Sequence, residues 1–109
     1  MADTTIAFFG ICIEVTDDEI ELLESGRHTK VAAAKAVGLQ LYWGNFGLPG
    51  EHYLLFVGKS IAKLGPENSS DVQLTSQKLM DIASYVSSRL VSAGFAEAPL
   101  FHLRLQPDS

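Results

Sequence analysis

The sequence predicts an α+β fold of the ferredoxin-like type, with two helices on one face of a four-stranded antiparallel sheet. Three patterns carry this prediction: a continuous apolar stretch at 5–15, an amphipathic helical pattern at 75–93 and an alternating strand pattern at 100–106. Together with the segments between them they give the split β-α-β-β-α-β order. Right-handed crossovers would place the first and third strands in the centre of the sheet and the other two at its edges.

The stretch 5–15 is rich in β-branched and aromatic residues and predicts a central strand that is covered on at least one face. The odd-numbered residues are wholly apolar and are assigned to the main core: Ala7, Phe9, Ile11, Ile13 and Val15. The even-numbered residues turn from apolar to charged and are assigned to the open face: Ile6, Phe8, Gly10, Cys12 and Glu14. We expect Gly10 to mark a bulge or a close backbone approach.

Residues 17–37 are predicted to be helical, either as one helix or as two. Thr16 and Glu19 have the spacing of a capping box, which marks the helix start. Gly26 then interrupts the pattern. A continuous helix would also turn two cationic side chains toward its apolar face, so we favour a break within residues 25–28.

Two strands joined by a long loop are expected next. Gly38 is a good helix stop, and residues 39–43 read as a short strand. Residues 44–50 hold three glycines and one proline, which predicts a loop. Residues 52–61 read as a second apolar strand, with an extension toward 64. If the protein binds a ligand, we expect the loop to border the site.

The helix at 75–93 has the clearest apolar stripe in the chain. The residues of that stripe are Leu79, Ile82, Ala83, Val86 and Leu90. The last strand, 100–106, alternates Phe101, Leu103 and Leu105 with His102, Arg104 and Gln106. This alternation predicts a half-exposed strand at an edge of the sheet.

Composition and charge exclude several classes. The 109 residues suit a single α+β domain, 1–109, and carry a formal net charge of −5, which disfavours nucleic acid as a partner. The single cysteine, Cys12, rules out an internal disulfide and suits a reducing compartment. No basic leader precedes the first apolar run, and no apolar run approaches the roughly 20 residues of a membrane span. We therefore expect a soluble, acidic, cytoplasmic protein with no membrane partner.

Some segments can be compared with known functional motifs, but the residues in or around them do not fit those motifs. Residues 58–60, Gly-Lys-Ser, resemble the end of a phosphate-binding loop, but Tyr53 stands where that loop needs glycine. Residues 29–39 have the alanine and glycine spacing of a helix-turn-helix, but glycines and Pro49 follow where a recognition helix should stand. The strand at 53–60 lacks the basic and aromatic pattern of an RNA-binding sheet.

The three histidines, at 28, 52 and 102, are far apart and show no metal-ligand spacing. Each is more simply explained as a surface or loop residue. We therefore expect no metal and no cofactor.

One constellation could carry chemistry. The last strand should lie antiparallel beside the first, which brings the open-face positions Cys12 and Glu14 toward His102 or Arg104. A carboxylate near a histidine and an arginine can bind an anion or move a proton. The ordinary alternative is a cross-strand charge pair. The candidate ligand-binding residues are Glu14, Tyr42, Trp43, His102 and Arg104.

These features favour a non-enzymatic regulatory or protein-interaction module that homodimerises through its open sheet face, because Ile6 and Phe8 would make that face too apolar for water. The competing hypothesis is a small enzyme or small-molecule binder with a pocket at the sheet face or the dimer interface. A third hypothesis is an acidic inhibitor of a basic protein, based on the carboxylates of 14–24. Helix capping and solvation also explain that acidic run.

Overall fold

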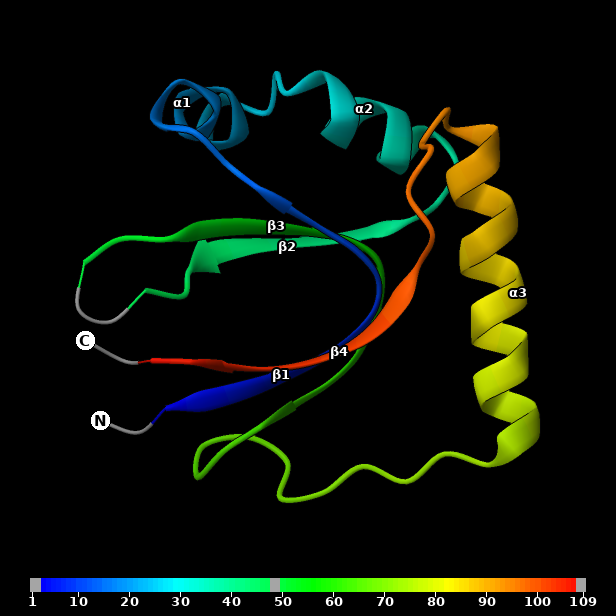
Figure 1. Ribbon diagram of the computed structural model, residues 1–109. Coiled ribbons are helices and arrows are strands. Elements are labelled where there is room, and N and C mark those ends of the chain that lie inside the picture. The colour runs from blue at the N-terminus through cyan, green and yellow to red at the C-terminus, as the bar shows by residue number, and fades with distance from the viewer. Residues whose placement is uncertain (1–2, 48–49, 108–109) are drawn as a thin grey trace.

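The computed structural model describes residues 3–47 and 50–107 as an α+β protein with an open, four-stranded antiparallel sheet and three helices (Figure 1). The elements are β1 (Thr4–Glu14), α1 (Asp17–Ser25), α2 (Thr29–Ala36), β2 (Gln40–Asn45), β3 (Tyr53–Leu64), α3 (Ser76–Ser92) and β4 (Leu100–Gln106). The sequence predicts a two-helix fold, whereas the described residues form three helices, because the segment 17–37 forms two helices rather than one. None of the described helices is both long and apolar enough to cross a membrane.

The break between α1 and α2 lies where the sequence favours it, and backbone geometry explains it. Gly26 adopts a left-handed conformation with φ 76°, and its amide donates to the Leu23 carbonyl. The next amide, of Arg27, donates to the Leu22 carbonyl at 2.9 Å, which completes a glycine-terminated helix end. The capping box at Thr16 is confirmed at the other end of α1.

His28 lies in the loop that joins the two short helices, as one of the two expectations had it, but it is buried rather than at the surface. Its Nδ1 accepts from the Lys30 amide at 3.2 Å and so caps the start of α2. Its Nε2 therefore carries the proton and donates to the Glu19 carboxylate at 2.8 Å. One imidazole thus fixes the angle at which α2 leaves α1.

This contact gives a pH-dependent stability. The hydrogen bond from His28, with a smaller contribution from the Thr16 amide, lowers the pKa of Glu19 below its ordinary value. A lowered carboxyl pKa stabilises the fold above the ordinary carboxyl range, and this contribution is lost as the pH falls below about 4.3. We expect Glu19→Gln to lower the unfolding free energy at pH 7, with the deficit shrinking toward pH 3. Urea titrations across this range measure it.

The control is Glu21→Gln, which removes an exposed carboxylate of the same helix. It should unfold like the wild type at every pH. A Glu19→Gln deficit that stays constant down to pH 3 would show that the carboxylate does not titrate with a lowered pKa.

The strands lie in the order β2-β3-β1-β4, with β1 and β3 in the centre and every neighbouring pair antiparallel. The β1–β3 register shifts between Ala7 and Phe8, where Ile61 is the extra residue on β3. β4 pairs with β1 from Gly10 down to Thr4. The remaining part of β1 runs on beside β3 alone.

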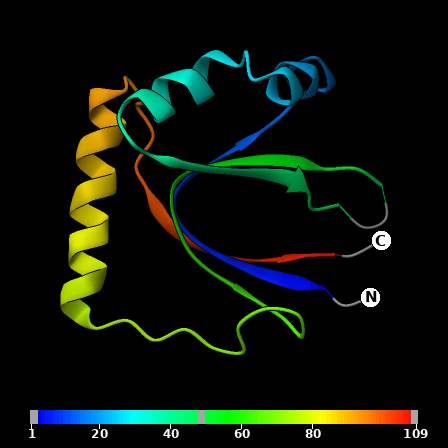
Figure 2. The same ribbon diagram turned by 180° about the vertical axis from the view of Figure 1, so that it is seen from behind.

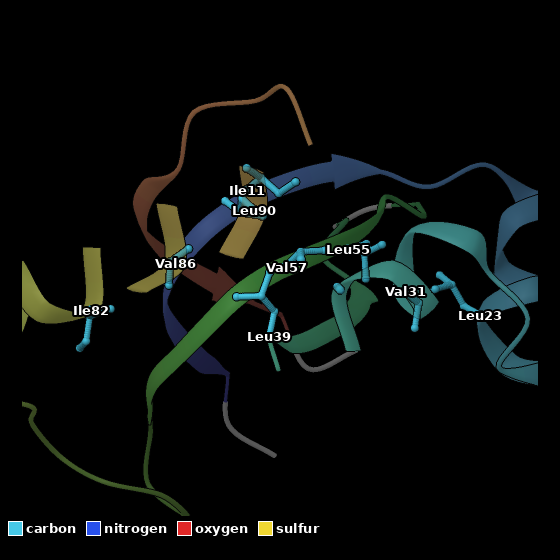
Figure 3. Close-up of a cluster of buried hydrophobic side chains, with 10 residues drawn as sticks. Ile11, Leu23, Val31, Leu39, Leu55, Val57, Ile82, Val86 and Leu90 are labelled. Carbon is cyan, nitrogen blue, oxygen red and sulfur yellow. The ribbon is translucent and has the colours of Figure 1, made fainter. Parts of the chain in front are cut away.

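A first apolar cluster joins the helices to the outer face of the sheet (Figure 3). It contains Ile11, Leu23, Val31, Ala34, Leu39, Leu55, Val57, Ile82, Val86 and Leu90. Ile82, Val86 and Leu90 are the buried residues of α3, which packs over β1 and β3. The predicted stripe is therefore confirmed at these three positions, whereas Leu79 is largely exposed.

The opposite face of the sheet is not the open apolar face that the sequence predicts. The central strands bend sharply, so that the sheet curls around its inner face while all three helices lie outside it (Figures 1 and 2). A second cluster fills the concave side: Ile6, Phe8, Phe46, Leu54 and Phe56, with Cys12 and Tyr42 packed against it. Ile6 is 2% exposed and Phe8 is 0% exposed. These two side chains are thus covered within one protomer.

Side chains of the two edge strands also meet across the concave side. The Tyr42 hydroxyl on β2 donates to Gln106 Oε1 on β4. Phe46, just after β2, packs edge-on against Phe56 with ring centres 5.5 Å apart. Because these contacts join distant segments of the chain, the concave face is covered by side chains of the same protomer.

Candidate functional site

The candidate ligand-binding residues are divided between the two faces of the sheet. Tyr42 packs against the concave cluster, whereas its neighbour Trp43 packs against the helix-side cluster. Adjacent strand residues point to opposite faces, so these two aromatic side chains do not line one wall. The Trp43 ring instead lies 6.3 Å from the ring of Tyr53.

His102 lies on the concave side and is held by structural contacts. Its Nε2 donates to the Gly10 carbonyl at 3.1 Å, and its ring meets Phe56 edge-on at 5.4 Å between centres. Because Nε2 is committed to a backbone carbonyl, packing explains His102 better than proton transfer does.

Glu14 lies apart from the other candidates. The β1–β4 ladder ends at the pair Gly10 and Leu100, and Glu14 continues beyond it. Its carboxylate lies 3.3 Å from Nε2 of His52, and both side chains are exposed. An exposed pair of this kind contributes little to stability. The structure thus brings Glu14 to a histidine other than the one expected.

Cys12 and Arg104 interact only through their charges. Burial raises the pKa of the Cys12 thiol, Arg104 lowers it by a smaller amount, and Glu14 raises it. The thiol is therefore kept protonated rather than activated. The Arg104 side chain itself is exposed, opposite Ile6 in the sheet register.

An open groove of about 450 Å³ runs along the β2 edge. Its lining includes Lys35, Gln40, Tyr42, Ser60 and Lys63. The Lys63 ammonium lies 4.8 Å from the centre of the Tyr42 ring, and Gln40 Oε1 accepts from the Ser60 amide at 2.7 Å. Burial raises the pKa of Tyr42 above its ordinary value. Sequence reasoning missed the two lysines because they lie on different elements.

The loop expected to border a site, 44–50, is partly structured. Asn45 Oδ1 accepts from the amides of Gly47 and His52, at 3.0 and 2.9 Å, and so closes the turn back to β3. Phe46 is buried in the concave cluster. The prediction also covers positions 48 and 49, which lie outside the described residues.

The outer face of β4 is exposed and apolar. Phe101 is 51% exposed, Leu103 is 62% and Leu105 is 55%. These three residues, here called the β4 surface, lie opposite Phe9, Ala7 and Thr5 on β1 and so share the helix side of the sheet. They stay exposed because α3 packs over β1 and β3.

The flank of α3 on the same side is also apolar. Tyr85 and Arg89 bond to the carbonyls of Gly38 and Val37, so their flank of α3 faces the β2 side of the sheet. At 100° per residue, Met80 and Val91 lie on the other flank, toward β4. Met80 is 62% exposed and Val91 is 75% exposed. Exposed apolar side chains are therefore present on α3 as well as on the β4 surface.

Among residues 3–47 and 50–107, no group of three or more His, Cys, Asp or Glu side chains is arranged to hold a metal ion. Comparisons with protein-family models, with curated proteins and with solved structures found no match.

Proposed function

We propose that this chain is a small, cytoplasmic, non-enzymatic interaction module of ferredoxin-like topology that homodimerises through the β4 surface. The observation that carries the proposal is the exposure of Phe101, Leu103 and Leu105 along an edge strand. Natural edge strands are normally protected by charges, prolines or bulges. On its helix side β4 presents only apolar side chains, and its charged residue, Arg104, lies on the concave side. A partner would supply the missing cover.

The size of the area fits a second copy. The exposed parts of Met80, Val91 and the β4 surface together offer on the order of 500 Å² per protomer, against the ~800 Å² per partner of a standard interface. Backbone groups and polar rim residues would add the remainder. Two copies could therefore cover one another without a conformational change.

The charge distribution also permits self-association. Residues 100–106 contain no carboxylate, although the chain carries a net charge of −5. The exposed acids of α1, among them Asp17 and Asp18, follow β1 at the end that extends past β4. Like-charge repulsion between copies would therefore be smallest around β4.

The expected result is a dimer for the wild type and a monomer for Phe101→Asp. Phe101 is half exposed, so an aspartate there should leave the fold intact while placing a desolvated charge in the interface. Light scattering coupled to size exclusion, across micromolar concentrations, measures the mass, and thermal melts check folding. Ser88→Asp adds the same charge on an exposed position of α3 and should remain a dimer. A wild type that stays monomeric at the highest concentration would overturn the proposal.

The β2 groove favours a second candidate, a binder of small anionic molecules. Lys35 and Lys63 flank it in a chain that is otherwise acidic, and Tyr42 supplies an aromatic wall. A monomeric wild type would make this groove the better candidate. The third hypothesis, an inhibitor that docks a basic protein, rests on the exposed acids of α1 alone.

A further inference from the structure

The direction of the peptide groups in β4 follows from its neighbour β1. The Val15 amide donates to the Tyr53 carbonyl at 3.0 Å, so odd-numbered residues of β1 turn their peptide groups toward β3. Peptide groups alternate sides along an antiparallel strand, and even-numbered residues of β1 therefore face β4. The His102 contact with the Gly10 carbonyl agrees with this assignment.

The same alternation carries across to β4. Even-numbered residues pair across the ladder, as Phe8 does with His102, so the even positions of β4 bond to β1. Phe101, Leu103 and Leu105 then turn their N–H and C=O groups to the free edge. These are also the three residues whose side chains form the β4 surface. The same residues thus offer both outward backbone hydrogen-bonding groups and exposed apolar side chains.

We propose that two copies join by antiparallel pairing of β4 with β4, centred on Leu103, into one continuous eight-stranded sheet. This inference rests on the proposed function and adds the geometry of its interface. For hydrogen bonds to form between the copies, the outward residues 101, 103 and 105 of one copy must lie opposite outward residues of the other. Since all of these are odd-numbered, the numbers of two paired residues must sum to an even value. Centring on Leu103 pairs all of Leu100–Gln106 and sets Phe101 against Leu105 of the second copy.

This register places the two copies of Leu103 beside one another on the two-fold axis. Their Cα atoms would lie about 5.5 Å apart, as in any hydrogen-bonded antiparallel pair. The two copies of Phe101, or of Leu105, would lie about 14 Å apart, because four residues of a strand separate them. Among pairs of the same residue, only the two copies of Leu103 are within the ~7 Å limit for a disulfide.

The test uses single cysteines in a Cys12→Ser background, after light scattering has established the dimer. Under mild oxidation, Leu103→Cys should cross-link to a covalent dimer at least about tenfold faster than Phe101→Cys or Leu105→Cys alone. An equimolar mixture of the latter two should cross-link well, because the register sets these positions opposite one another. Cross-linking fastest at 101 or 105 alone, or equally slowly at all positions and in the mixture, would overturn the register while leaving the dimer proposal intact.

Amide exchange tests the same register without any substitution. In the concentrated wild type, the amides of Phe101, Leu103 and Leu105 should exchange at least about tenfold more slowly than after dilution to monomer. Even-numbered amides of β4 should be protected in both states. A dimer that leaves the three odd-numbered amides unprotected would show that the copies pack face to face rather than edge to edge.

Discussion

Replacing Val86 by aspartate should leave little folded protein. Val86 is 0% exposed and lies between Ile82 and Leu90 on the buried stripe of α3, against the outer face of β1 and β3 (Figure 3). A carboxylate at this position must stay charged without solvent or take up a proton at neutral pH. Either outcome costs several kcal/mol, from a total stability of about 5–15 kcal/mol.

The matched substitution is Ser88→Asp on the exposed side of the same helix. It adds the same side chain and charge without burial, so its melting temperature should stay within a few degrees of the wild type. Thermal unfolding followed by circular dichroism compares the two variants. Equal melting temperatures would mean that α3 is rotated about its axis relative to the packing described.

Replacing Gly58 by alanine should have an effect of similar size by a different mechanism. Gly58 on β3 pairs with Gly10 on β1. A Cβ on Gly58 would lie 2.1 Å from the Phe9 carbonyl oxygen and 2.8 Å from the Gly10 Cα. Both are backbone atoms, so no side chain can move to relieve the clash. The two strands would have to separate, with loss of several kcal/mol.

Gly26→Ala is the control for this prediction. Gly26 adopts φ +76°, but a Cβ there would meet no atom within 4 Å, so only backbone strain of about 1 kcal/mol is expected. Gly58 also has a positive φ of +154°, so Gly58→Ala combines backbone strain with the clash, and urea unfolding of both variants measures how far its loss exceeds that of Gly26→Ala. Losses of equal size would show that the close approach of β1 and β3 contributes nothing beyond the ordinary preference for glycine.

The curled sheet restricts where this protein can bind. Its concave side is occupied by its own side chains, and His102 there is bonded to the Gly10 carbonyl. These contacts do not support a pocket on that face, which is one of the two locations that the enzyme hypothesis allows; the other is the dimer interface. The outer face of β4 and the β2 groove remain accessible to a partner or ligand.

The sequence by itself determined the local structure. The Thr16 capping box, the break at Gly26 and the strand 100–106 lie where expected, because caps, glycine stops and alternation depend on neighbouring residues. The close approach at Gly10 was also predicted and is confirmed by its contact with β3. The buried positions on α3 followed from helical spacing, since one face must pack.

Only the tertiary structure decided which surfaces are covered. Alternation divides the residues of β1 and β4 between two faces, but it does not say which face is covered by other elements. Phe8 is buried because distant segments curl over it, whereas Leu103 is exposed because α3 lies over β1 and β3. The same long-range geometry sends Glu14 to His52 rather than to His102. Such contacts depend on the curvature of the whole sheet, which no local pattern in the sequence encodes.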